Sequence, residues 1–359
     1  MQLVARTALW SAGLAGVLFL TVILSAGIGP VAIDPLVILK VLLNGVAVPT
    51  SIDVGGSGLL GVDLGFAPLF AFDVPETSRT IVLTIRLPRI LLGAIVGVSL
   101  AAAGAVMQGF FRNPMADPSI IGVSSGAAVG AVAAITLSAA LPVGLNLHTA
   151  AFLTGLVTAF GVYLIATENG RTPVATLLLA GVAVQTFLGA VISYMLVESG
   201  QSLQRAVFWL MGHLHNATWG EVGASMIAAP PLLLVLFAYS RDLNVLLLGE
   251  EDAQTLGIEV ERTKQILLGV SALITAAAVA VSGVIGFVGL IVPHMMRLLV
   301  GPDHRILLPT SALAGGAFLV LADTFARSGP AELPVGIVTA ALGAPFFLYL
   351  LRRREVHAL

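Results

Sequence analysis

The chain has no cysteine, only two lysines and few charged residues of any kind. The absence of cysteine excludes disulfides, thiolate metal sites and thiol catalysis. Charged residues make up 10% of the 359 residues, whereas a typical soluble domain is about one-quarter charged. The formal net charge of −2 leaves no basic field that would attract nucleic acid.

Catalytic motifs are also missing from the sequence. A nucleotide-binding phosphate loop ends in Gly-Lys-Ser/Thr, and neither Lys40 nor Lys264 has that context, so the chain does not hydrolyse ATP by itself. It contains no HExxH, no serine nucleophile elbow and no cluster of His with carboxylates, so we predict no catalytic residues, no metal site and no cofactor. We interpret His213, His215 and His294 as separate structural side chains.

What the chain has in abundance is apolar sequence: 58% of residues are hydrophobic and the mean hydropathy is +1.03. About 20 apolar residues in a helix cross a hydrocarbon core of about 30 Å. We predict an all-α integral membrane protein, one transmembrane domain over residues 1–359, with the lipid bilayer as its solvent. Its ten transmembrane helices are expected at residues 8–28, 90–111, 119–140, 149–167, 174–197, 222–240, 265–282, 284–300, 306–327 and 335–351.

The sequence allows more than one interpretation at two of these places. The apolar run from 265 to 300 is too long for one crossing, so we divide it at Ser282-Gly283. Residues 8–28 resemble a signal peptide, but their apolar run is longer than a usual signal core, so we interpret them as a retained span. Asp323 is the one acid well inside a predicted span, which argues against a proton-driven carrier, since such carriers bury several ionisable groups.

The basic residues set the orientation. With ten spans both termini lie on one side, and eleven of the 17 Lys and Arg residues fall on that side. Loops rich in Lys and Arg stay in the cytoplasm. We therefore predict a cell-membrane protein with both termini cytoplasmic and with residues 29–85 as a long extracytoplasmic loop.

The loop at 29–85 is rich in Gly and Asp, which favours turns over regular structure. We expect a solvated loop, with a dedicated ligand or metal site as the alternative. Residues 31–44 are apolar enough to form one short helix lying on the membrane.

The charged segment at 241–264 interrupts the apolar chain on the cytoplasmic side. Its leucines, among them Leu243 and Leu247, predict a short apolar helix, and Gly249 permits a sharp turn. Glu250 and Glu251 then suit the first turn of a second helix, whose N-terminus favours acids. Gly257 supplies a left-handed C-terminal stop. We interpret this pair of helices, which also contains Gln254, as an element that receives mechanical work from a partner; a solvated charged loop is the alternative.

Several long motifs in fixed order resemble the permease family that imports iron chelates, haem and cobalamin in ATP-binding-cassette systems. They are RLPRILLGAIVGVSLAAAGAVMQGFFRNPMADPSIIGVSSGAAVGA from residue 86, TPVATLLLAGVAVQ, FWLMGHLHNATW, LLLGEEDAQTLGIEVERTK, GVIGFVGLIVPHMMRLLVGPDHRILLP and AELPVGIVTAALGAPFF. The match runs in register from residue 86 to the C-terminus. The long loop at 29–85 departs from the family pattern.

The resemblance implies ten spans per subunit, a homodimer with the substrate path along its axis, two cytoplasmic ATPase subunits and an extracytoplasmic substrate-binding protein. The helices that sit in the ATPase groove correspond to residues 243–257, a cytoplasmic two-helix coupling element. Arg86, Arg89 and Arg327 lie at the outer ends of spans. The resemblance supports them as cations that face water and pair with carboxylates on the binding protein; anchoring to lipid headgroups is the alternative.

Bulky cargo needs a wide path with few strong contacts. Small and polar residues suit that path better than charges, although each of them can instead hydrogen-bond between helices. We assign to the path Ser124, Ser125, Thr176, Gln185 and Ser193, and to an inner gate Gln108 and Asn113. The glycines at 122, 126 and 130 mark a face where helices pack closely.

Three functions are compared. The first is the permease subunit of an importer for a large metal chelate, with cobalamin favoured over ferric siderophore or haem. The second is an ion-driven secondary transporter, which uptake without any ATPase would indicate. The third is a membrane-embedded enzyme, for which no reactive constellation is visible.

Overall fold

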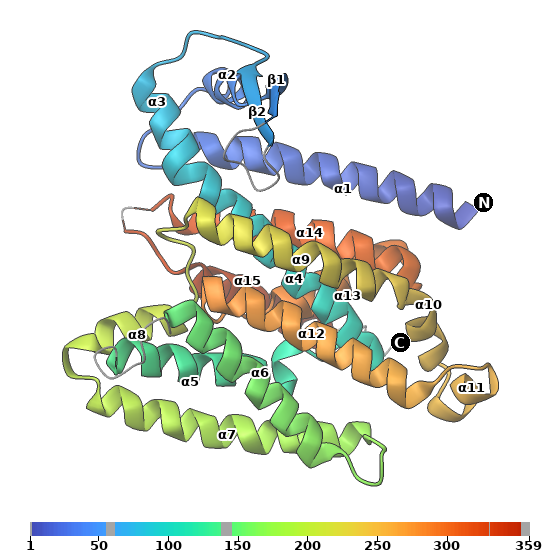
Figure 1. Ribbon diagram of the computed structural model, residues 1–359. Helices are drawn as coiled ribbons and strands as arrows, with labels where there is room; N and C mark the ends of the chain where they lie inside the picture. The colour runs from blue at the N-terminus through green and yellow to red at the C-terminus, as the bar shows by residue number, and fades with distance from the viewer. Residues whose placement is uncertain (1, 55–61, 138–145, 330, 353–359) are drawn as a thin grey trace.

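The computed structural model describes residues 2–54, 62–137, 146–329 and 331–352. Nearly all of the regular structure is helical (Figure 1). The N-terminal part contains α1 (Gln2–Gly27), α2 (Pro35–Asn44), β1 (Ala47–Val54), β2 (Val62–Pro68), α3 (Glu76–Thr80), η1 (Ile81–Arg86), α4 (Leu87–Phe110), η2 (Pro118–Ile121), α5 (Val123–Thr136) and α6 (Leu147–Ala166). The remainder contains α7 (Val174–Glu198), η3 (Gly200–Ser202), α8 (Leu203–Leu210), α9 (Trp219–Ala238), α10 (Ser240–Leu246), α11 (Glu250–Thr255), α12 (Val260–Ser282), α13 (Val288–Val300), α14 (His304–Ala326) and α15 (Val335–Arg352).

Helix α4 forms the centre of the bundle, with α9, α12, α13 and α14 around it (Figure 1). The helical run Glu76–Phe110 has 35 residues, and 83% of its most apolar window is buried. Small residues allow this burial, because helices in lipid associate by close packing rather than by the hydrophobic effect. A Cβ on Gly97 would overlap the backbone of Gly315 in α14, and one on Gly104 would overlap Gly289 in α13.

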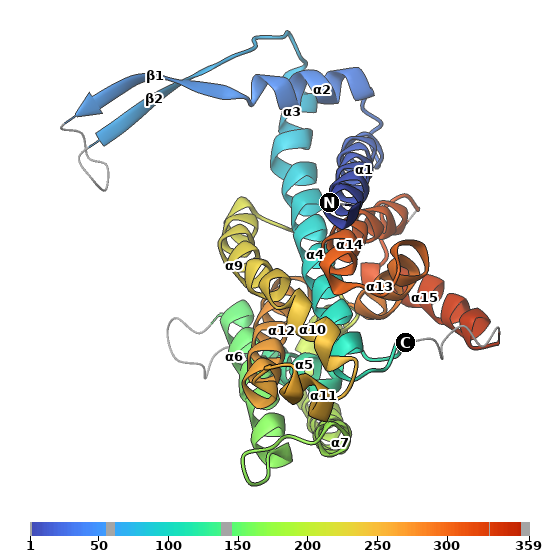
Figure 2. The ribbon, with the colours of Figure 1, turned by 90° about the vertical axis from the view of Figure 1, so that its right-hand side faces the viewer.

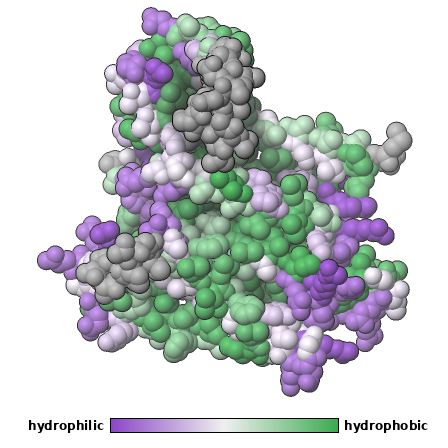
Figure 3. Space-filling view, in the orientation of Figure 1, coloured by the Kyte–Doolittle hydropathy of each residue, from purple (hydrophilic) through white to green (hydrophobic). Residues whose placement is uncertain are grey.

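The predicted glycine face in α5 packs against α6. A Cβ on Gly126 would overlap Thr158, and one on Gly130 would overlap Thr154. Outward-facing positions on the peripheral helices stay apolar, for example Leu179 and Val197 on α7 and Ile227 on α9. The face in view in Figure 3 shows apolar side chains over much of the bundle, as expected of a surface that lies in lipid.

Each predicted span contains a helix, and seven helices of the described ranges are long and apolar enough to cross a membrane. The other three, α5, α13 and the apolar part of α15, are shorter, so ten crossings remain a prediction. The division at 282–283 is confirmed, because α12 ends at Ser282 and Gly283 has a φ of +68°. Span starts at 119 and 284 are wrong by four residues: α5 follows the left-handed Gly122 and α13 the left-handed Phe287.

The expectation of turns over regular structure in residues 29–85 is wrong for most of the described part of that segment, and residues 55–61 lie outside the described residues. The segment holds α2, as the sequence allowed, and an antiparallel hairpin in which Ala47 pairs with Pro68 and Val54 with Val62. The hairpin continues from the C-terminal end of α2 and projects sideways from the rest of the molecule (Figure 2). β-branched residues recur at every second position of β1 and favour an extended strand there, whereas the glycines between the two strands lie outside the described residues.

Candidate functional sites at the two ends of the bundle

The segment at 241–264 forms two short helices, α10 and α11, joined at Gly249, which has a φ of +128°. Glu250, Glu251 and Asp252 occupy the first turn of α11. Gly257 follows the helix with a φ of +85°, in the left-handed region that favours glycine. The predicted shape of this pair of helices is therefore observed, and we call it the α10–α11 knob.

Helix α10 is anchored to the bundle. Leu243 is fully buried and α10 packs on α4 and α14. The Asn244 amide donates to Asp303 at 2.7 Å, and its carbonyl oxygen accepts the His304 backbone N–H at 2.8 Å. Asp303 caps the N-terminus of α14, and hydrogen bonds from Arg305 lower its pKa to about 2. Movement of α10 must therefore move the start of α14.

Helix α11 is anchored through an ion cluster that the sequence did not reveal. Lys264 Nζ lies 3.1 Å from a carboxylate oxygen of Glu250 in α11 and 2.9 Å from one of Glu261 in α12. The other Glu261 oxygen accepts the backbone N–H of Thr172, at 3.2 Å, in the α6–α7 connection. The Lys264 side chain is 3% exposed. One lysine thus ties three segments together, while Glu251 and Gln254 remain exposed on the outer face of the knob.

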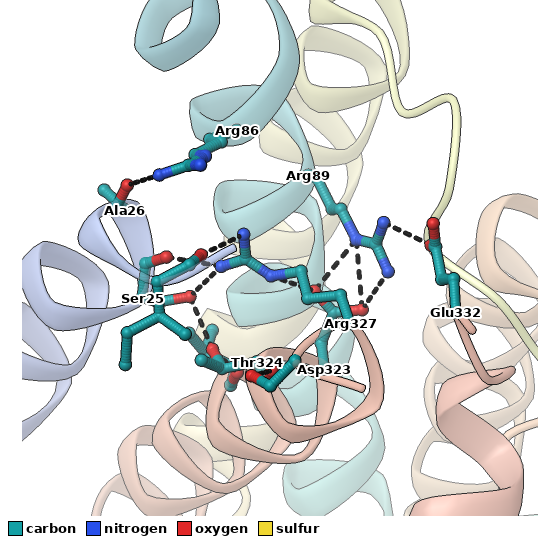
Figure 4. A network of polar contacts seen from close by, with 11 residues as sticks. Ser25, Ala26, Arg86, Arg89, Asp323, Thr324, Arg327 and Glu332 are labelled. Atoms are coloured by element: carbon teal, nitrogen blue, oxygen red, sulfur yellow. Dashed lines mark hydrogen bonds and ion pairs between the residues drawn. The ribbon is translucent and has the colours of Figure 1, made fainter. Parts of the chain in front are cut away.

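The opposite end of the bundle holds the three predicted arginines, brought together near the end of α1 (Figure 4). Arg86 donates to the carbonyl oxygens of Ala26, at 2.5 Å, and Val31. Arg327 donates to the carbonyl oxygens of Ser25, at 2.5 Å, and Ile28, at 2.9 Å. These bonds supply partners to carbonyls at a helix C-terminus, which lack intrahelical donors.

Arg89 forms the charged core of the same network. Its guanidinium donates to both carboxylate oxygens of Asp323, with the shortest contact at 2.7 Å, and to Glu332 at 2.5 Å. Arg327 Nε also lies 3.6 Å from Asp323. We call this set, with Arg86, the arginine network.

The prediction that the three arginines face water is wrong for Arg86 and Arg327, which are 4% and 8% exposed. They lie inside because the end of α1 and the 28–31 turn cover them. The Arg89 side chain is 12% exposed, and its partner Glu332 is the exposed member of the network at 46%. Asp323, the acid expected inside a span, is 2% exposed and paired with two guanidinium groups.

The residues assigned to the path differ in their surroundings. Gln185 of α7 donates to the Ile120 carbonyl at 2.8 Å, and the buried Ser124 donates to Ser119 at 3.0 Å. Both bonds fit the alternative of contacts between chain segments. Ser125 is half-buried. The exposed members are Thr176 and Ser193, on α7.

The residues assigned to an inner gate have structural partners. Gln108 is fully buried; its amide donates to the Leu290 carbonyl at 2.8 Å, and its carbonyl oxygen accepts from Arg297 at 3.1 Å. It therefore joins α4 to α13. Asn113 accepts the Met115 backbone N–H at 2.9 Å and stabilises a turn after α4.

Comparison with known proteins bears on both ends of the bundle. A model of the FecCD transport family matches residues 17–353. The chain is 58% identical to the cobalamin import system permease protein BtuC of Halobacterium salinarum over 99% of each chain. It is 42% identical to the hemin transport system permease protein HmuU of Yersinia pestis, over 84% of this chain and 92% of the relative. A solved metal-chelate type ABC transporter in an inward-facing conformation superposes with a TM-score of 0.77 at 30% identity, covering 96% of this chain and 98% of that one.

Proposed function

The chain belongs to the FecCD transport family, and we propose that it is the permease subunit of an ATP-binding-cassette importer for cobalamin. The assignment of cobalamin as the cargo rests on one observation: the chain is 58% identical, over 99% of both chains, to a protein named as a cobalamin import permease. Haem is the second candidate, because a hemin permease is 42% identical over 84% of the chain.

We place ten crossings in the bilayer, with α5, α13 and α15 as the three shorter ones and with both termini and the α10–α11 knob in the cytoplasm. The excess of Lys and Arg on that side supports this orientation. The family pattern supports a homodimer that binds two ATPase subunits and one substrate-binding protein. The exposed apolar positions on α7 and α15, among them Phe187 and Leu348, suit contact with lipid or with a second subunit.

The α10–α11 knob is the proposed coupling element. Its exposed outer face, with Glu251 and Gln254, offers contacts to an ATPase, and its inner face is fixed to α4, α12 and α14 by Leu243, Asn244 and Lys264. Because each anchor ends on a different long helix, a displacement of the knob is distributed to the bundle instead of being absorbed by a hinge.

The arginine network is the proposed docking site for the binding protein. Since Arg86 and Arg327 are buried, docking must proceed by exchange of partners: an incoming carboxylate replaces Glu332 at Arg89. Arginine suits this exchange because its planar fork binds carboxylates in bidentate fashion. Glu332 then acts as a competitor that the binding protein displaces.

The exchange is tested with Glu332→Gln. Removing the competing carboxylate is expected to raise the association rate of the binding protein and to steepen its salt dependence, because rim charges act mainly on association. The matched control is Glu76→Gln, a glutamate of the same end whose side chain is 79% exposed. Equal association rates for Glu332→Gln and the unmodified dimer would refute docking by exchange.

The transport function is tested in vesicles that contain the permease dimer, the ATPase and the binding protein. Labelled cyanocobalamin uptake should require ATP and the binding protein, with haem and a ferric siderophore as competitors that fail to reduce it. Uptake that persists without the ATPase, and that Asp323→Asn abolishes, would instead identify an ion-driven carrier.

A further inference from the structure

A cavity of about 710 Å³ lies between α8, the 211–217 segment and α4, close to the arginine network. Its lining includes His148, Arg205, Phe208, His213 and His215. The sequence suggested separate histidines, but the structure brings two of them together: the ring centroids of His213 and His215 are 4.2 Å apart. Neither the coupling element nor the docking site uses this pair.

The histidine pair is held firmly in place. Phe208 stacks on the His213 ring with centroids 5.4 Å apart and meets the His215 ring edge-on at 4.7 Å. The His213 backbone N–H donates to the Ser282 carbonyl at 2.7 Å, and Gly212 accepts from Gly336 at 3.2 Å. The turn that carries both imidazoles is therefore fixed to the end of α12 and the start of α15.

Both imidazoles are half-buried. Burial lowers the pKa of His213 to about 4, and neighbouring His215, Arg89 and His148 act in the same direction. Burial also lowers the pKa of His215, with Glu332 opposing and Arg89 assisting the shift. A neutral imidazole presents a nitrogen lone pair, which makes it the commonest metal ligand among side chains.

The pair suits a metal that already has most of its ligands. Among the described residues no group of three or more His, Cys, Asp or Glu is arranged to hold an ion, so a bare cation would find too few donors here. The Nδ1 atoms of His213 and His215 are buried without a hydrogen-bond partner. A histidine in a tight metal site donates the N–H of its other ring nitrogen to a second group. That hydrogen bond is missing here, so coordination of a metal through Nε2 would be weak. Weak coordination suits a cargo that must be released again.

We propose that His213 and His215 form a reception site that coordinates the metal of the incoming chelate, and this rests on the proposed function. The cargo class is a planar chelate with one exchangeable axial position, such as a cobalt corrinoid that carries axial water. The cobalt–oxygen bond to water breaks, water leaves with its electron pair, and one imidazole Nε2 donates its lone pair to cobalt. The oxidation state of cobalt and the proton count do not change.

The probe is aquacobalamin, added to permease in lipid nanodiscs without ATPase, binding protein or histidine tag. We expect a saturable shift of the visible absorption band, because replacement of axial water by imidazole changes the ligand field. The double variant His213→Asn/His215→Asn should lose the shift entirely. The control His148→Gln should keep the shift. His148 lines the same cavity, but its Nε2 lies 3.4 Å from a carboxylate oxygen of Glu221 and is therefore not assigned to the metal.

Cyanocobalamin provides a ligand control, because its axial cyanide does not exchange readily, and it should give no shift. Dimer elution and thermal unfolding of the double variant establish that it is folded. No shift with the unmodified permease, or a shift that persists in the folded double variant, overturns the reception site. Cyanocobalamin uptake by the unmodified chain tests the proposed function separately, so normal uptake without coordination overturns the histidine site alone.

Discussion

Replacing Lys264 with methionine should uncouple ATP hydrolysis from uptake while the protein remains folded. Lys264 is 3% exposed and contacts Glu250 of α11 and Glu261 of its own helix, so the substitution removes the ionic contact of α11 with α12 together with the Lys264–Glu261 pair inside α12, and it keeps a side chain of similar length. Methionine fills the buried space without charge. The perturbation is therefore directed at the anchoring of the knob.

The size of the effect follows from the exposure of the two partners. Hydrogen bonds to charged groups contribute about 1.5–3 kcal/mol each, and leaving a fully buried charge alone costs about 3–5 kcal/mol. Glu250 and Glu261 are 38% and 28% exposed, so water compensates most of that penalty. We expect a net loss of about 2 kcal/mol in the docking of α11, which is roughly a 30-fold change in its docking equilibrium.

The assay is the number of ATP molecules hydrolysed per cobalamin taken up by reconstituted vesicles. This ratio should rise in Lys264→Met, fall back toward normal in Lys264→Arg, and stay unchanged in Lys40→Met, which replaces the other lysine of the chain at an exposed position. A double-mutant cycle with Glu250→Gln should show non-additive effects. An unaltered ratio in folded Lys264→Met dimers would refute the anchoring role of the ion cluster.

Three further predictions follow from the geometry. Gly257→Pro should abolish uptake but not ATP hydrolysis, because proline fixes φ near −65° and Gly257 has a φ of +85°; equal uptake would exclude a rigid knob. Gly104→Ala should lower the thermal stability of the purified protein by about 1–3 kcal/mol, because its Cβ overlaps Gly289, whereas Gly161→Ala, with open space around it, should not; equal melting temperatures would contradict the close packing of α4 on α13. Burial lowers the pKa of His213 to about 4, so below about pH 6.5 the unfolded state binds more protons at this residue than the folded state does. The free energy of unfolding should therefore fall as the pH drops from about 6.5 to 4. The variant His213→Asn should flatten this pH dependence, and an equally steep dependence in that variant would contradict the assignment.

The helices and their breaks follow largely from the sequence. Long apolar runs give the spans, and Gly249, Gly257 and Gly283 mark turns because their backbone conformations favour glycine. The predicted form of the α10–α11 knob is observed for the same reason. Helix starts were less predictable: Gly122 and Phe287 adopt left-handed conformations that shorten α5 and α13, and nothing in the apolar pattern marks those residues.

Contacts between distant segments were not predictable from one sequence. Lys264 and Glu261 are close along the chain, but their connection to Glu250 and Thr172 depends on how α11 and the α6–α7 connection fold back. His213 and His215 looked unrelated to any ligand, since neither Phe208 nor the cavity is visible in a residue pattern. The hairpin in residues 47–68 was missed because glycine content outweighed strand propensity in our interpretation.

The burial of the arginines has a physical cause that lies in α1. The last carbonyl groups of a helix lack intrahelical donors and carry partial negative charge, and Ser25 and Ala26 are the residues whose carbonyls receive Arg327 and Arg86. At this end of the bundle the chain therefore satisfies its own cations, and for this reason the proposed docking proceeds by exchange at Arg89. At the α10–α11 end the reverse holds, because Lys264 is satisfied internally and the exposed Glu251 and Gln254 are left to meet a partner. If both proposals hold, the two ends differ in the kind of contact they offer: competitive ion-pair exchange at one, and a surface fixed from within at the other.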